Sequence, residues 1–201
     1  MSLLDMLLGR VKGAERRRRR SSFKTGLDLP ENLHLEDGIV VVPWDAPEEL
    51  RWLAFKMAKA VQRAEGYDFP SFPRPGIWLT KEEHDWMRDH RLRVYLVIKD
   101  GRAVAYSLVV DTDHWHQWRV LDEEGESVEE VGQFTGGPRP LVGPLFVVEN
   151  LRGQGIGRSL LDRVAADAGV SPSDIVGEVP LTRAGRLLAM RLRDDGTFLS
   201  S

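Results

Sequence analysis

The chain has 201 residues, of which 42% are hydrophobic, and a formal net charge of −3. This length favours one domain with a single sizeable core. No apolar run approaches the roughly 18 residues that cross a bilayer, so we expect no transmembrane segment. The absence of cysteine excludes a disulfide framework, a thiolate nucleophile and a cysteine zinc site, and it suits a reducing cytosol, so we expect a cytoplasmic protein.

Charge is divided unevenly along the chain. Residues 1–24 hold eight Lys or Arg against Asp5 and Glu15, about +6, which leaves about −9 on the rest. We interpret residues 1–26 as a basic, flexible tail and residues 27–201 as one domain. A solvated tail is the simplest interpretation. The alternative is contact with the phosphates of a nucleic acid or with an anionic surface, through Arg16, Arg17, Arg18, Arg19 and Arg20.

The domain begins with a strand and a helix. The β-branched run "GIVVVPW", residues 38–44, predicts a strand. Asp45 as N-cap, with apolar residues at helical spacing after it, predicts a helix that ends at Gly66. A proline-rich loop follows, and Thr80 with Glu83 three residues later forms a capping box for a short second helix.

Three further strands and an insertion come next. Asp100 and Gly101 join "RLRVYLVIK" to "RAVAYSLVVDT", which predicts an antiparallel hairpin. The polar stretch at about 113–139 is an insertion in the form of a second hairpin, turning at 124–126. The near-continuous apolar run "LVGPLFVV", residues 141–148, predicts a strand buried on both faces.

Glycines at every second position follow that strand and open a helix. Arg152, Gly155 and Gly157 satisfy the pattern R-x-x-G-x-G, and Gly153 adds a third glycine. A helix N-terminus presents unpaired N–H groups and the positive end of its dipole, so a turn without side chains can wrap an anion closely. The motif indicates a pyrophosphate site, and its alternative is a tight structural turn.

Two other phosphate-binding loops do not fit. A Walker motif needs Gly-Lys-Ser/Thr, whereas Gly157 is followed by Arg158 and Ser159. The dinucleotide fingerprint needs a small residue where Leu160 stands, and it belongs near the start of a βαβ fold. We therefore expect neither a nucleotide triphosphatase nor a dinucleotide enzyme.

The stretch "LFVVENLRGQGIGRSLLDRV" resembles the signature of the GCN5-related N-acetyltransferases, a strand followed by [RQ]-x-x-G-x-[GA] and a helix. The order of elements over residues 38–198 is also similar to that fold. The resemblance implies an α/β (α+β) domain with a mixed, mostly antiparallel central sheet flanked by helices. The β-hairpin insertion would be an addition to it.

The same resemblance implies a cofactor and the residues that hold it. The cofactor is acetyl-coenzyme A or another acyl-coenzyme A, with its pyrophosphate at the glycine turn and its pantetheine arm paired like a strand with residues 146–148. The binding residues that follow are Phe146, Val147, Val148, Arg152, Gly153, Gln154, Gly155, Ile156, Gly157 and Arg158.

Catalysis needs a base for the amine and an acid for the leaving thiol. Glu178 is our first choice as base, because the C-terminal stretch "EVPLTRAGRLLAMRLRDDGTFL" is similar to the ending of the cohesin acetyltransferases. Glu149, just past the buried strand, is the second candidate. The family often supplies a tyrosine where Leu192 stands, so either another donor such as Ser159 or water serves, or catalysis is weak or absent.

The inserted hairpin carries residues of metal-ligand type and acidic residues. Asp111, Asp113, His114 and His116 lie close together, yet no third clear ligand stands at helical spacing, so we expect no metal site. The acidic stretch at 122–130 attracts a cationic amine or is simply a solvated face.

The sequence thus predicts an N-acetyltransferase that acts by direct attack of a small-molecule or protein amine on an acyl-coenzyme A. The alternative is a catalytically weak or inactive binding module of the same fold, whose basic tail contacts nucleic acid.

Overall fold

The computed structural model describes residues 25–65, 72–120 and 127–177. The strands are β1 (Leu27–Asp28), β2 (Gly38–Pro43), β3 (Arg93–Lys99), β4 (Arg102–Thr112), β5 (His114–Val120), β6 (Ser127–Gln133), β7 (Arg139–Val147) and β8 (Val176–Gly177). The helices are α2 (Glu48–Glu65), α3 (Lys81–Asp89) and α4 (Ile156–Ala168), with 3-10 turns η1 (Glu149–Leu151) and η2 (Pro172–Asp174).

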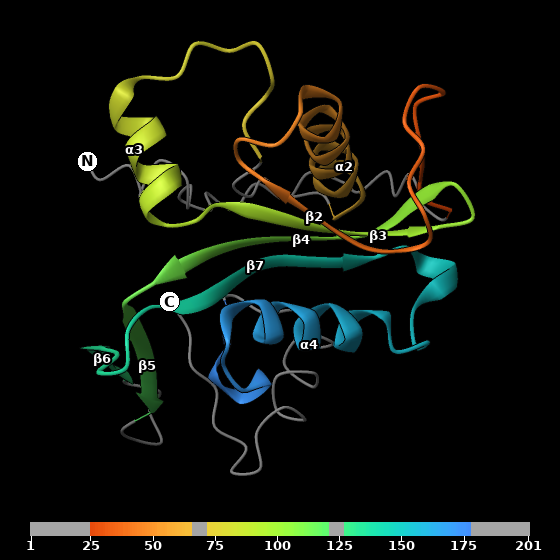
Figure 1. Ribbon diagram of the computed structural model, residues 1–201. Coiled ribbons are helices and arrows are strands. Elements are labelled where there is room, and N and C mark those ends of the chain that lie inside the picture. The colour runs from red at the N-terminus through yellow and green to blue at the C-terminus, as the bar shows by residue number, and fades with distance from the viewer. Residues whose placement is uncertain (1–24, 66–71, 121–126, 178–201) are drawn as a thin grey trace.

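A central sheet in the order β2-β3-β4-β7-β8 separates two layers of helices. Figure 1 shows α2 and α3 on one face of the sheet and α4 on the other. Every described pairing in this sheet is antiparallel except that of β7 with β8, which is parallel. The expected mixed, mostly antiparallel sheet flanked by helices is therefore confirmed. None of the helices in the described ranges is long and apolar enough to cross a membrane.

Local sequence signals account for the first helices and the first hairpin. The Thr80–Glu83 capping box is formed at the start of α3 as predicted. Asp100 and Gly101 have φ angles of 51° and 69°, the left-handed conformations that a two-residue hairpin turn needs. The predicted cap of α2 is wrong, because the helix begins at Glu48 and Asp45 lies in the turn before it.

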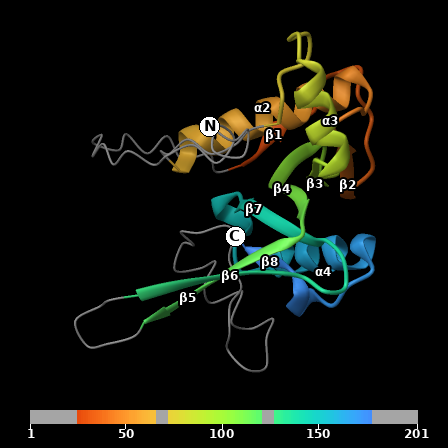
Figure 2. The same ribbon diagram turned by 90° about the vertical axis from the view of Figure 1, so that its left-hand side faces the viewer.

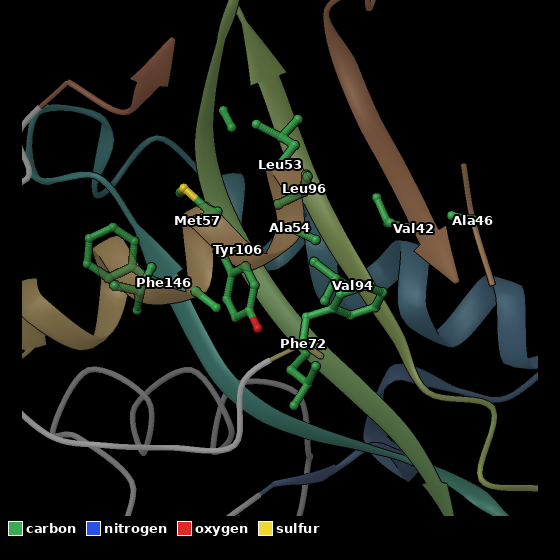
Figure 3. Packing of buried hydrophobic residues seen from close by; sticks show 14 of the residues in the cluster. Val42, Ala46, Leu53, Ala54, Met57, Phe72, Val94, Leu96, Tyr106 and Phe146 are labelled. Atoms are coloured by element: carbon green, nitrogen blue, oxygen red, sulfur yellow. The ribbon is translucent and has the colours of Figure 1, made fainter. Parts of the chain in front are cut away.

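Two apolar clusters hold the layers together, one on each face of the sheet. Beneath α2 the cluster includes Leu53, Met57, Tyr106 and Phe146, all buried (Figure 3). Beneath α4 a second cluster includes Leu160 and its neighbours on that helix. Because β4 and β7 contribute side chains to both clusters, these two strands are fixed from both faces.

The inserted hairpin stands apart from the central sheet. β5 and β6 pair with each other antiparallel from His114 opposite Gln133 to Val120 opposite Ser127. They form a separate two-stranded sheet, which extends away from the body in Figure 2. The expected second hairpin is present in this pairing, and the turn expected at 124–126 lies outside the described residues.

A buried ion pair joins β3 to β4 just before the inserted hairpin begins. The Arg93 guanidinium lies 2.8 Å from the Asp111 carboxylate, and both side chains are about nine-tenths buried. Arg91 lies 3.3 Å from the other carboxylate oxygen, and the Asp111 N–H donates to the His90 carbonyl at 2.7 Å. Asp111 therefore joins β4 to the turn between α3 and β3.

We expect Asp111→Ala to lower the free energy of unfolding by about 3–5 kcal/mol, because Arg93 would keep a buried charge without its partner. Urea unfolding measures the change. Combining Asp111→Leu with Arg93→Met should restore most of the loss, since neither charge is then buried alone. Asp28→Ala, which breaks an exposed pair with Arg102, is the control and should have little effect. Equal losses in the free energy of unfolding in all three variants would contradict the stabilising role of the buried Arg93–Asp111 pair.

Candidate functional site

The strand before the glycine motif is interrupted by a β-bulge. Val109 of β4 lies opposite Val142 and Ser107 lies opposite Leu145, so β7 has one more residue than β4 in this interval. The residues inside it are Gly143 and Pro144. Proline has no N–H for the ladder, and a bulge bends its strand. Sequence reasoning missed this feature, although a Gly-Pro pair within an apolar strand run is its signal.

Past the bulge, one edge of β7 has no partner strand among the described residues. β8 pairs only with Leu141 and Val142. The Val148 N–H donates to the Val104 carbonyl of β4 at 3.0 Å. Backbone groups of a strand alternate in direction, so those of Leu145 and Val147 are directed to the opposite, open edge.

This alternation separates the three residues expected to pair with a pantetheine arm. Phe146 and Val148 are buried in the core, and their backbone groups are directed toward β4. Of the three, only Val147 directs its backbone to the open edge, and its carbonyl already accepts from Arg152. Leu145, which sequence reasoning did not name, is directed to the same edge.

Arg152 fastens the end of β7 to the glycine turn. Its Nε donates to the Val147 carbonyl at 2.8 Å, and its guanidinium lies 5.4 Å from the centre of the Phe146 ring. The other arginine of the motif, Arg158, is paired with Asp162 one turn along α4, at 2.8 Å. Both arginines expected to add charge beside an anion are thus engaged by protein atoms.

The glycine turn is open toward solvent. Gly153 and Gly155 have φ angles of 80° and 84°, and a Cβ built on either would meet no atom within 4 Å. These glycines are required by their backbone conformation, because other residues are strained there. Gly155 is the N-cap of α4, and no side chain of the described residues caps the helix.

The first amides of α4 are consequently available to a ligand. The first intrahelical bond is from the Ser159 N–H to the Gly155 carbonyl, at 2.9 Å. In the described part of the chain no acceptor is found for the N–H groups of Ile156, Gly157 and Arg158. They lie at the positive end of the helix dipole, where an anion is stabilised. The side chain of Gln154 is directed to the Asn150 carbonyl and does not block them.

The two candidate bases differ in position. Glu149 is exposed and is the first residue of η1, at the glycine-turn end of β7. Glu178 lies outside the described residues, immediately after Gly177, which pairs with Val142 beside the bulge. Leu192 and the C-terminal stretch also lie outside them.

The described tyrosines are not at the open edge. Tyr95 and Tyr106 are fully buried on β3 and β4, and burial raises the pKa of each phenol above its usual value. Tyr67 falls outside the described residues. Ser159 is exposed in the first turn of α4.

Three of the four residues of metal-ligand type contact other groups of the protein. Asp111 pairs with Arg93, and the Asp113 carboxylate contacts Nδ1 of His114 at 2.5 Å. Over residues 25–65, 72–120 and 127–177, no group of three potential ligands is close enough to hold a metal ion.

Comparisons with known proteins show the family and the fold of this chain. The sequence model of the acetyltransferase (GNAT) family matches residues 47–170. The xEco2 acetyltransferase domain bound to a K105-CoA conjugate is similar at 16% identity over 83% of this chain and 93% of its own, with a TM-score of 0.60. A second structure of that domain is similar at 16% identity over 90% of this chain and 98% of its own, with a TM-score of 0.58.

An acetyltransferase structure with acetyl-CoA from Clostridium acetobutylicum is similar at 15% identity over 77% of this chain and 88% of its own, with a TM-score of 0.44. No curated protein matches the sequence significantly. The resemblance expected from the glycine motif is confirmed, and the xEco2 structures agree with the cohesin-acetyltransferase likeness of the C-terminus.

We expect Gly155→Ala to lower the free energy of unfolding by about 1–2 kcal/mol, because alanine is strained at this φ. It should also weaken coenzyme A binding at least about tenfold, since the new Cβ would stand where we expect the pyrophosphate to lie. Gly157→Ala is the matched control, because the family pattern accepts alanine there and the position is helical. Calorimetry and urea unfolding measure both effects. Unchanged affinity in Gly155→Ala would show that no ligand approaches this backbone.

Proposed function

Because the chain belongs to the GNAT family of acetyltransferases, we propose that it transfers an acetyl group from acetyl-coenzyme A to an amine by direct attack. Acyl-coenzyme A is the cofactor of this family. The observation that carries the proposal is the continuity of the open β7 edge with the uncapped start of α4. The acceptor is a small-molecule or protein amine.

The coenzyme would run along β7 in the direction opposite to the chain. Its pyrophosphate accepts from the amides of Ile156, Gly157 and Arg158, and its pantetheine arm lies beside Val147 and Leu145. Because a strand rises about 3.3 Å per residue, the arm from Val147 to the bulge spans roughly 13 Å. The thioester would then lie at the bulge, next to the residues of β7 that pair with β8. There the Leu145 N–H is available to donate to the carbonyl oxygen as negative charge develops on it.

The transfer itself requires one proton to be removed and one thiolate to leave. The neutral amine nitrogen attacks the thioester carbon, the C–N bond forms, and the C–S bond breaks as coenzyme A departs. Glu178 is the better base, since it follows Gly177 next to the bulge, whereas Glu149 belongs to the pyrophosphate end. With leucine at 192, the thiolate is protonated by water or by another donor.

The second candidate function is a binding module that keeps the fold without efficient catalysis. Leucine at 192 favours it, together with the burial of Tyr95 and Tyr106 in the sheet. A salt-sensitive mobility shift with nucleic acid that is lost on deleting residues 1–24, with no thiol released from acetyl-coenzyme A by any amine, would support this module.

We expect the full chain to bind acetyl-coenzyme A in calorimetry and to release thiol when an amine is added. Absence of binding at millimolar acetyl-coenzyme A would exclude both this cofactor and the acetyltransferase activity. Binding without thiol release across small amines and lysine peptides would leave only the second candidate.

We expect Glu178→Gln to lower kcat by roughly 10²- to 10⁴-fold, the usual contribution of a general base, with little change in the Kd for acetyl-coenzyme A. The rate of the wild-type protein should fall as the base is protonated at low pH, and this limb should vanish in the variant. Glu149→Gln is the control and should retain activity. The reverse pattern would assign the base to Glu149.

A further inference from the structure

Two adjacent hydrophobic side chains in the loop between α2 and α3 are exposed to solvent. Trp78 is 98% exposed and Ile77 is 55% exposed, and no other large hydrophobic residue is exposed among those whose exposure the structure describes. Single apolar residues are common on protein surfaces, but this pair keeps a whole indole and a neighbouring isoleucine in water. Such an apolar area is typical of a contact site for a partner.

Buried residues on both sides hold the pair outward. Phe72 is fully buried in the cluster beneath α2, and Leu79 packs against the same cluster. Between them the Ile77 N–H donates to the Arg74 carbonyl at 3.4 Å, and Gly76 has a φ angle of 78°, which favours glycine. The exposed pair therefore sits on a turn that is anchored at both ends.

The surroundings of this pair are positively charged. Residues 50–64 and 72–81 contain six Lys and Arg and no Asp or Glu: Arg51, Lys56, Lys59, Arg63, Arg74 and Lys81. None of the six forms an ion pair with another described residue. Since residues 25–201 together carry about −9, this is a positive surface on an acidic domain.

Three of these cations form a row on the solvent face of α2. Lys56, Lys59 and Arg63 are three and four residues apart, so they share the side of the helix opposite the buried Leu53 and Met57. Lys56 and Arg63 are exposed, and Lys59 is half-buried. The row follows the helix axis for about 10 Å, so its charge is spread over an extended surface.

Arg74 joins the loop to this helix face. Its guanidinium lies 5.6 Å from the centre of the Trp52 ring on α2, and the Lys59 ammonium lies 5.8 Å from the centre of the Phe55 ring. Figure 1 and Figure 2 show α2 and the loop on the same side of the central sheet, away from α4. The loop and the row thus form one surface, here named the cationic face: Lys56, Lys59, Arg63, Arg74, Ile77 and Trp78.

An anionic membrane surface is complementary to the cationic face. Its headgroup phosphates attract Lys and Arg, and the hydrocarbon just beneath them accepts apolar side chains, with tryptophan favoured at the boundary. A single-stranded nucleic acid matches less well, because base stacking needs several free rings. The rings of Trp52 and Phe55 are already covered by Arg74 and Lys59, and Ile77 has no ring.

We propose that the cationic face docks the protein on an anionic membrane, with Ile77 and Trp78 inserted at the boundary between headgroups and hydrocarbon. α4, whose first amides belong to the candidate coenzyme site, lies on the other side of the sheet in Figure 1, so docking leaves these amides accessible. The inference goes beyond the proposed function, because no residue of the cationic face is assigned to the candidate site.

The test measures co-sedimentation of the full chain with vesicles of phosphatidylcholine, with and without phosphatidylglycerol. We expect binding only to the anionic vesicles, and binding that weakens as salt is added. Combining Ile77→Ser with Trp78→Ser should weaken this binding at least about tenfold, because the inserted apolar area is lost. Both side chains are exposed, so the urea unfolding curve should not change.

A charge variant replaces the three cations of the α2 row by glutamine. It should bind anionic vesicles at least about tenfold more weakly, with a shallower salt dependence. The matched control removes three cations on other elements and should bind within about threefold of wild type, because the cationic face is intact. Its substitutions are Lys99→Gln, Arg102→Gln and Arg163→Gln.

Tryptophan emission distinguishes the cationic face from the basic residues 1–24, which contain no tryptophan. The emission of the wild-type protein should shift to shorter wavelength when anionic vesicles are added, because the Trp78 indole leaves water. The shift should be absent in Trp78→Ser.

Absence of wild-type binding to anionic vesicles would overturn the proposal. So would equal vesicle affinity in the wild type and the double serine variant, which would assign membrane contact to another part of the chain. A mobility shift with single-stranded nucleic acid that the charge variant loses, without vesicle binding, would assign the cationic face to nucleic acid. Wild-type binding to vesicles without binding to coenzyme A would support the docking and contradict only the proposed function.

Discussion

The bulge at Gly143 and Pro144 is the feature on which the candidate site depends. Before it, β7 has strands on both sides, β4 and β8. After it, β4 still pairs with β7, while no described strand covers the other edge. A regular strand here would continue its parallel ladder with β8 and use the backbone groups of Leu145 and Val147. One extra residue thus converts the middle of a buried sheet into an edge that a ligand can join.

The apolar clusters on both faces of the sheet keep β7 in place although one of its edges is unpaired among the described residues. β4 and β7 send side chains into the cluster under α2 and the cluster under α4, so the sheet remains fixed although one ladder is incomplete. Arg152 holds the far end of the open edge by its bond to Val147. The start of α4 follows directly, so an extended ligand meets a strand edge first and a helix terminus next, on one continuous piece of chain.

The two arginines of the glycine motif make contacts that differ from those expected from the motif. An arginine before a glycine turn is naturally interpreted as a phosphate ligand, but here Arg152 contacts a carbonyl and Arg158 an aspartate. At the start of α4 the attraction for an anion therefore comes mainly from the helix amides. Residues 1–24 hold eight of the 28 Lys and Arg against two acidic residues, and β1 pairs with β4 just past the end of β7.

The sequence by itself determined three features that depend on neighbouring residues: the hairpin turn at Asp100 and Gly101, the capping box of α3, and the order of strand, glycine turn and helix. It also located the glycine motif by which the chain resembles the GNAT family, because those residues are contiguous. Only the tertiary structure decided which edge of β7 is open, that Leu145 belongs to it, and that β1 follows the end of β7 along the same edge of β4. These depend on strand pairing and register between distant segments, which no local pattern of residues encodes.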